Sequence, residues 1–151
     1  MTSGHEHSSV DMAPEGFVPT HHFRPFEHFA GPFYERATGS TLDLGFRVQD
    51  RHLNADGACH GGVLATFADI QGYALKKLLG LAVATPTITL SVDYLAPARE
   101  GDWVTGRPQL VKQTGKMLFF QSLCSVGDEA VLRVNGIYRL TRAELTGSNR
   151  F

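Results

Sequence analysis

The chain has 151 residues, and its 14 lysine and arginine residues against 15 aspartate and glutamate residues give a formal net charge of −1 at pH 7. This length fits one domain with a sizeable core, and the near-neutral charge does not favour nucleic acid or an acidic membrane surface as a partner. Two cysteines cannot build a disulfide framework or a zinc site, which is typical of a reducing compartment. No apolar run approaches the roughly 20 residues of a transmembrane helix, and the first twenty residues do not resemble a signal peptide. We therefore expect a cytoplasmic protein of one domain.

The first 22 residues are expected to form a flexible tail, because they contain serine, histidine, glycine and proline with little periodicity. Histidine pairs without carboxylates or cysteines make poor metal sites. We therefore expect no metal at the histidines of this segment, which are His5, His7, His21 and His22.

A single folded domain is expected over residues 23–145, followed by a C-terminal tail at residues 146–151. Its first part, from Phe23 to Phe33, contains four phenylalanines separated by prolines and charged residues. This composition favours a short helix or loop packed over the edge of the core. The alternative is that the segment forms the roof of a ligand pocket.

Alternation of apolar and polar residues predicts several strands. In the segment 41–49, leucine, phenylalanine and valine occupy every second position, which is the period of a strand with one buried face. Glycine-containing turns separate most of the other segments of this kind. The predicted strands are residues 33–37, 41–49, 85–94, 103–112, 117–126 and 130–140.

A helix is predicted from Gly61 to a stop near Gly80, because apolar residues recur at three- and four-residue steps without an intervening proline. Apolar residues occupy most of its circumference, which indicates a helix covered by other elements. Asp69 is the one charged group in the middle of this helix. It belongs to a narrower, more polar stripe that consists of Gly62, Thr66, Asp69 and Tyr73.

The order of elements is therefore two strands, one long buried helix and four further strands. Such a chain is predicted to be an α+β protein in which a curved antiparallel sheet wraps around one long central helix.

The start of the helix and its carboxylate suggest a catalytic site. The first N–H groups of a helix have no acceptor within the helix and carry partial positive charge, so the Gly61 N–H could polarise a substrate carbonyl. Asn54 or His60 could supply a second donor or fix the loop, and Asp69 could act as a nucleophile or as a general base. The alternative is that both residues have structural roles. Asp69 would then be a surface carboxylate or an ion-pair partner, and Gly61 would only begin the helix.

Distance argues against a site within one chain. Eight residues of helix separate Gly61 from Asp69 by about 12 Å, at roughly 1.5 Å per residue. Two antiparallel helices related by a two-fold axis would bring Gly61 of one chain to Asp69 of the other. If this is an active site, the spacing predicts that it lies between two subunits. A Cys59–His60 dyad is a weaker candidate, because sequence neighbours rarely present their side chains to each other.

The loop and helix resemble a known family. The pattern Asn-x5-His-Gly-Gly-x3-[Ser/Thr]-x2-Asp is similar to that of hotdog-fold acyl-CoA thioesterases of the phenylacetate-degradation (PaaI-like) branch. A second similarity runs from Thr87 through Tyr94-Leu95-Ala96-Pro97-Ala98 to Gly101-Asp102, and the resemblance covers about residues 38–141. The first pattern is formed here by Asn54, His60, Gly61, Gly62, Thr66 and Asp69.

The resemblance implies a hotdog fold, paired into homodimers and commonly into homotetramers. It implies that Asp69 is the catalytic base or nucleophile and that the Gly61 N–H binds the thioester carbonyl. Asn54 would lie beside the leaving thiolate or the water, His60 would support the loop, and Thr87 would hold the attacking water. Asp69 and Thr87 would come from one subunit and Gly61 and Asn54 from its neighbour. The family uses no metal or redox cofactor, and coenzyme A is part of the substrate.

The predicted function is hydrolysis of an acyl-CoA to a free acid and coenzyme A, and the phenylalanine-rich segment suggests an aryl-acetyl or medium-chain acyl group. We expect Gly62 and Thr66 to contact the substrate, and the motif leaves open which basic residues meet its phosphates. Residues Thr114, Gly115 and Lys116 are our choice for that contact. The alternative is a non-catalytic acyl-CoA-binding hotdog domain, which an aliphatic residue at position 69 would favour.

Overall fold

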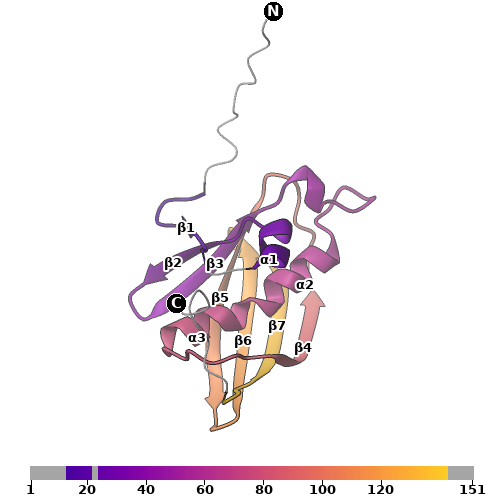
Figure 1. The fold of residues 1–151 in the computed structure, drawn as a ribbon. Coiled ribbons are helices and arrows are strands. Elements are labelled where there is room, and N and C mark those ends of the chain that lie inside the picture. The colour runs from indigo at the N-terminus through magenta and orange to yellow at the C-terminus, as the bar shows by residue number, and fades with distance from the viewer. Residues whose placement is uncertain (1–12, 22–23, 143–151) are drawn as a thin grey trace, which may run out of the picture.

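The computed structural model describes residues 13–21 and 24–142, which form one sheet and a set of helices on one of its faces (Figure 1). The strands expected from the sequence are confirmed, with ends that differ by no more than two residues. In chain order the elements are β1 (Val18–Pro19), α1 (Pro25–Ala30), β2 (Tyr34–Thr38), β3 (Thr41–Arg47), the 3-10 helix η2 (Asp50–His52), α2 (Gly61–Asp69), α3 (Gln71–Leu78), β4 (Thr87–Tyr94), β5 (Trp103–Gln113), β6 (Met117–Val126) and β7 (Glu129–Arg139).

The seven strands form one antiparallel sheet in the order β1-β2-β3-β5-β6-β7-β4. After β3 the chain leaves the middle of the sheet, runs along α2 and α3, and returns as β4 at the far edge beside β7 (Figure 1). It then fills the gap with β5, β6 and β7. The α+β architecture predicted from the order of elements, an antiparallel sheet around a central helix, is confirmed.

The core lies between the sheet and the helices. Phe67 of α2 is fully buried and packs on Phe46 of β3, with ring centroids 4.9 Å apart. Leu64 and Ala68 bury the same side of α2, as the three- and four-residue spacing predicts. Burial of each large side chain contributes roughly 2 kcal/mol, so this apolar face fixes α2 on the sheet.

The long helix predicted from Gly61 is interrupted at Ile70, which separates α2 from α3. The Tyr73 N–H bonds to the Ile70 carbonyl at 3.0 Å, a tighter turn than that of an α-helix. Asp69 is therefore the last residue of α2 and is partly exposed. The break places its carboxylate at a helix end, where the sequence predicts the middle of a continuous helix.

The N-terminal segment begins to pack before residue 23, the expected start of the domain. Phe17 is buried against Trp103, with ring centroids 5.1 Å apart, and Arg36 lies over its ring. β1 pairs with β2. The other residues of the expected tails, 1–12, 22 and 146–151, lie outside the described part of the chain, and so do His5, His7 and His22.

None of the helices in the described ranges, 13–21 and 24–142, is long and apolar enough to cross a membrane.

The face of the sheet opposite the helices carries a buried ion-pair cluster. The Asp43 side chain is completely buried, and Arg107 donates from Nε to its Oδ1 at 2.6 Å and from Nη2 to its Oδ2 at 2.9 Å. Arg36 adds a bond to Oδ2 at 3.1 Å. Burial alone would raise the pKa of the Asp43 carboxyl, but the hydrogen bonds and charges of Arg107 and Arg36 outweigh burial and hold that pKa below its usual 3.8.

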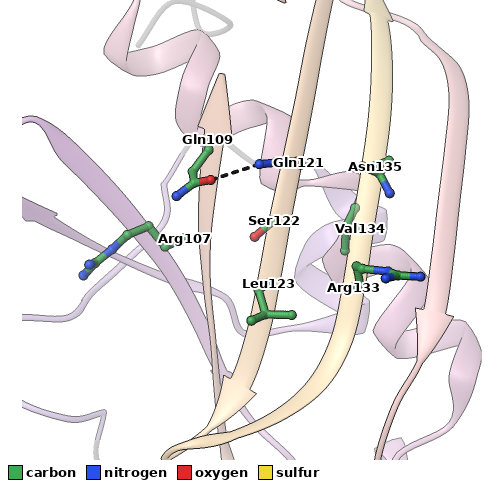
Figure 2. Close-up of a pocket in the computed structure, with 8 residues that line it drawn as sticks. All are labelled: Arg107, Gln109, Gln121, Ser122, Leu123, Arg133, Val134 and Asn135. Carbon is green, nitrogen blue, oxygen red and sulfur yellow. Dashed lines mark hydrogen bonds between the residues drawn. The ribbon is translucent and has the colours of Figure 1, made fainter. Parts of the chain in front are cut away.

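The same face carries a shallow groove of about 330 Å³ beside the cluster, and most of the residues that line it have polar side chains (Figure 2). Arg133 on its rim is paired with Asp93, with Nε and Oδ2 2.8 Å apart, and both side chains are largely exposed. The groove is lined by Arg107, Gln109, Gln121, Ser122, Leu123, Arg133, Val134 and Asn135.

Asp43→Asn is expected to lower the free energy of unfolding by about 2 kcal/mol at pH 7, because a buried neutral amide replaces the carboxylate that accepts charged hydrogen bonds from Arg107 and Arg36. The pKa of Asp43 is lower in the folded than in the unfolded chain. The cluster therefore stabilises the fold above about pH 4, and this stability is lost as the pH falls further. Denaturant unfolding of wild type and variant between pH 3 and 7 measures both effects.

Asp93→Asn is the matched control, because the exposed Asp93–Arg133 pair should contribute less than about 1 kcal/mol. Equal destabilisation by the two substitutions would contradict a structural role for the Asp43 cluster.

Candidate active site

The start of α2 presents a free backbone donor. His60 is the N-cap residue of α2, and its Nδ1 accepts a hydrogen bond from the Gly62 N–H at 2.8 Å. The Gly61 N–H has no acceptor within the part of the chain that the structure describes, as expected for the first residue of a helix. The cap thus satisfies one of the first N–H groups and leaves its neighbour available to a ligand.

Asn54 organises the loop before α2. Its Oδ1 accepts from the backbone N–H groups of Asp56 and Ala58, at 3.0 and 3.1 Å. These contacts fix the orientation of the side-chain amide, because both partners are donors. The NH₂ group of Asn54 is therefore the part of the side chain that can donate to a ligand.

An open cavity of about 380 Å³ joins Asn54 to Gly61. Its opposite wall comes from the end of β4, where the Tyr94 hydroxyl donates to the Gly61 carbonyl at 2.9 Å. A Cβ atom on Gly61 would lie 3.4 Å from the Tyr94 ring, an ordinary contact distance. Tyr94 lies in the second segment that resembles the family, and sequence reasoning did not assign it a role in the site.

Asp69 and Thr87 meet at the other end of α2. The Thr87 hydroxyl donates to Asp69 Oδ1 at 2.7 Å, which joins the helix end to the first residue of β4. Because the Thr87 hydrogen is committed to Asp69, the lone pairs of its oxygen remain free to accept a hydrogen bond from water. The two residues therefore form a small acceptor-rich site around the carboxylate.

Tyr138 holds the backbone at the same place. Its hydroxyl donates to the carbonyl of Asp69, the acceptor that Tyr73 would use in a continuous helix. A Cβ atom on Gly72 would lie only 2.3 Å from the Tyr138 ring, so this glycine is what allows the ring to approach the helix. In the sheet, Tyr138 pairs directly with Thr87. One strand pair therefore holds both the backbone and the side chain of Asp69.

The Tyr138 phenol stays protonated at neutral pH and can donate its hydrogen bond there. Its burial and the negative charge of Asp69 raise its pKa well above the usual value of 10, although the Gly72 N–H acts in the opposite direction.

Within one chain these two half-sites lie apart. Gly61 and Asp69 occupy the two ends of α2, and a helix of nine residues separates them by about 12 Å. Gly61 and Asn54 share one cavity, and Asp69 and Thr87 share a hydrogen bond. Gly61 with Asn54 and Asp69 with Thr87 are the two pairs that the sequence leads us to expect from different subunits.

The residues predicted to contact the substrate lie in two places. Gly62 and Thr66 line the side of α2 that faces α1. Thr114, Gly115 and Lys116 form the exposed turn between β5 and β6, where Thr114 Oγ1 accepts from the backbone N–H of Lys116. Through the pairing of β6 with β7, this turn lies at the Thr87 end of the sheet rather than at the Gly61 end.

The structure disfavours the thiol–imidazole dyad. Burial raises the pKa of the Cys59 thiol to about 11, so it is protonated at neutral pH. Its Sγ contacts the carbonyl of His60, whereas the His60 ring caps the helix. Among the described residues, no three histidine, cysteine, aspartate or glutamate side chains are grouped as metal ligands would be.

An antiparallel sheet around a central helix is the hotdog fold, and solved structures of this class superpose on the chain. The PaaI protein of the E. coli phenylacetic acid degradation operon does so with a TM-score of 0.69, at 19% identity, over 81% of this chain and 88% of the other. At this identity the similarity concerns the fold alone.

Sequence comparison identifies the family. The profile of the thioesterase superfamily matches residues 56–130. A putative esterase of Pseudomonas aeruginosa is 31% identical over 129 residues, which cover 84% of this chain and 96% of that protein. Human acyl-coenzyme A thioesterase 13 is 32% identical over 79 residues, which cover 51% of this chain and 54% of that protein. The chain belongs to the thioesterase superfamily, and its class of activity is thioester hydrolysis.

Tyr138→Phe is expected to lower kcat for a thioester substrate about tenfold with little change in KM, because Asp69 loses the bond that fixes its backbone. Tyr73→Phe is the matched control. Its hydroxyl donates to Glu35 at 3.1 Å, so this variant loses a phenolic hydrogen bond to a carboxylate on β2 rather than the bond to the Asp69 carbonyl. Steady-state kinetics with unfolding curves of both variants separate positioning from general destabilisation. Equal kcat values for the two would contradict the positioning role.

Proposed function

We propose that this protein hydrolyses acyl-CoA thioesters, with Asp69 as the catalytic carboxylate and the Gly61 N–H as the oxyanion donor. The observation that carries the proposal is the pair of half-sites on α2: a free N–H at its start, and at its end a carboxylate held by Thr87. The thioesterase family and the relative named acyl-coenzyme A thioesterase 13 support the substrate class.

The proposed reaction follows from the groups at the two ends. The thioester carbonyl oxygen accepts from the Gly61 N–H, and a preorganised donor of this kind is worth about 3 kcal/mol as negative charge develops. In one route, Asp69 accepts a proton from a water that hydrogen-bonds to Thr87 as the water oxygen attacks the carbonyl carbon. In the other, the Asp69 carboxylate attacks that carbon itself and forms an acyl–aspartate anhydride, which water hydrolyses after the thiolate has left. The C–S bond then breaks, and coenzyme A leaves as a thiolate that needs little acid assistance. The products are a carboxylic acid and coenzyme A.

Asn54 and His60 serve the donor half of the proposed site. The Asn54 NH₂ group can stabilise the departing thiolate or the water, while its Oδ1 maintains the loop. The His60 cap occupies the Gly62 N–H and keeps the adjacent N–H directed toward the substrate. The proposed reaction needs neither a metal nor a redox cofactor, because coenzyme A is part of the substrate.

We further propose a homodimer, and a homotetramer formed from two dimers, in the cytoplasm. β4 lies at the edge of the sheet and spans eight residues, so its outer backbone groups can pair with another chain. Ile88 and Tyr94 on this strand are more than half exposed. Pairing of two β4 strands across a two-fold axis would place the two α2 helices antiparallel, so that each donor end approaches a carboxylate end.

The proposal is tested by measuring hydrolysis of acyl-CoAs with short, medium, long and aromatic acyl groups. Release of free thiol reports the reaction. Asp69→Asn should fold and assemble normally and lose turnover by about three orders of magnitude. Asp93→Asn is the control, because it removes an exposed carboxylate at the end of β4 away from Thr87. Full turnover in Asp69→Asn would contradict the assignment. Binding of acyl-CoA without hydrolysis by the wild type would instead support the non-catalytic alternative.

A further inference from the structure

A second cavity lies beside the start of α2, on the side that faces α1. It measures about 340 Å³, and its walls come from α1, the 3-10 helix η2 and the first residues of α2. Mostly apolar atoms line it. We call this cavity the α1 pocket. The residues that line it include Phe26, Phe29, Arg51, His52, Val63 and Thr66.

Two exposed phenylalanines mark the α1 pocket as a place for a ligand. Phe26 and Phe29 are 62% and 78% exposed although both belong to a helix of six residues. Exposed aromatic side chains that line a cavity are typical of binding sites. Their side chains lie outside the buried core and line the cavity instead.

The α1 pocket is held in shape by Arg51. Its guanidinium donates to the carbonyls of Phe29 and Gly31 and to the side chain of Gln49. These bonds fix the end of α1 against η2, so the helix that carries Phe26 and Phe29 is held in place. Preorganisation of this kind lowers the entropy cost of binding a ligand.

The α1 pocket has few polar groups, and among the described residues the buried Nε2 of His52 has no hydrogen-bond partner. The Thr66 hydroxyl donates to the Gly62 carbonyl at 3.0 Å, so the polar group of this side chain already has a partner within α2. The other group on the Thr66 Cβ atom is an apolar methyl. His52 is buried and packs edge-on against Phe46. Burial, together with the charge of Arg51, lowers the pKa of His52, so its ring is uncharged at neutral pH. These walls suit an uncharged apolar group.

The start of α2 separates the α1 pocket from the cavity of Asn54 and Tyr94. Gly61 belongs to that cavity, and the next two residues, Gly62 and Val63, line the α1 pocket. A carbonyl bound at the Gly61 N–H therefore has an apolar space on one side and the more polar Asn54 loop on the other. The acyl chain of a thioester would enter the first, and the sulfur would face the second.

We propose that the α1 pocket binds the acyl group of the substrate and selects apolar acyl groups of aryl-acetyl or medium-chain size. This inference rests on the proposed acyl-CoA thioesterase function. An engineered cavity of about 150 Å³ accommodates benzene, so the α1 pocket has room for an aromatic ring or a chain of similar bulk. Phe26, Phe29 and Val63 are the residues that determine specificity.

The test compares kcat/KM for acetyl-, octanoyl- and phenylacetyl-CoA in wild type, Phe29→Ala and Val63→Phe. Phe29→Ala should lower kcat/KM for octanoyl- and phenylacetyl-CoA about tenfold and change that for acetyl-CoA less than about twofold. Val63→Phe fills the pocket and should shift preference toward acetyl-CoA. Leu123→Ala is the matched control, because this leucine is 56% exposed on the opposite face of the sheet (Figure 2).

Three results would overturn the proposal in distinguishable ways. An unchanged preference in both pocket variants, with hydrolysis that still depends on Asp69, would show that the acyl group binds elsewhere. Loss of assembly in Phe29→Ala, with all substrates affected equally, would show that a second copy of the chain covers the pocket. Absence of hydrolysis of every acyl-CoA by the wild type would contradict the proposed function itself.

Discussion

The length of α2 is the constraint that determines how this protein can work. A free N–H at its first residue and a carboxylate at its last are separated by about 12 Å, and neither can move toward the other, because the buried face between them packs on the sheet. A small reacting group cannot contact both ends of one helix. In the mechanism that we propose, each helix therefore supplies half of two different sites, and the edge strand β4 is where a second chain would add to the sheet.

The sheet fixes the position of Asp69 at the end of α2. Thr87 and Tyr138 face each other across β4 and β7, and they hold the side chain and the backbone of Asp69 respectively. Helix ends fray because their last carbonyl groups have no partner within the helix. Here the Tyr138 phenol of β7 donates to such a carbonyl, and the helix is interrupted at the following residue. A strand that carries no catalytic group thereby positions the carboxylate.

Much of the fold could be predicted from the sequence because its signals are local. Period-two alternation located the strands, and glycine and proline marked their turns. The Asn54–Gly61 loop could also be found, because its cap and turn contacts join residues only two to four positions apart. The break at Ile70 was not predicted, and the hydrogen bond beside it comes from Tyr138, which lies 69 residues from Asp69. Gly72 was the available signal, because a glycine within a helical pattern can indicate close approach of another group.

The α1 pocket illustrates the same limit. The phenylalanine-rich segment suggested either a cover for the core edge or a roof for a ligand, and composition could not separate the two. Phe33 is buried in the core, whereas Phe26 and Phe29 project from α1 over the start of α2. The position of α1 involves bonds that Arg51 makes to carbonyls 22 and 20 residues away. Pattern alone does not contain that information.

The most direct test of a site shared between subunits mixes two inactive variants, Asp69→Asn and Asn54→Asp. Asn54→Asp retains the acceptor that organises the loop and removes the NH₂ donor. After confirmed subunit exchange, about half of the dimers are mixed, and each mixed dimer holds one intact site. Recovery of about a quarter of wild-type turnover is therefore expected. Turnover that stays at the level of the separate variants, with exchange verified by mass spectrometry, would contradict a site built from both ends of α2.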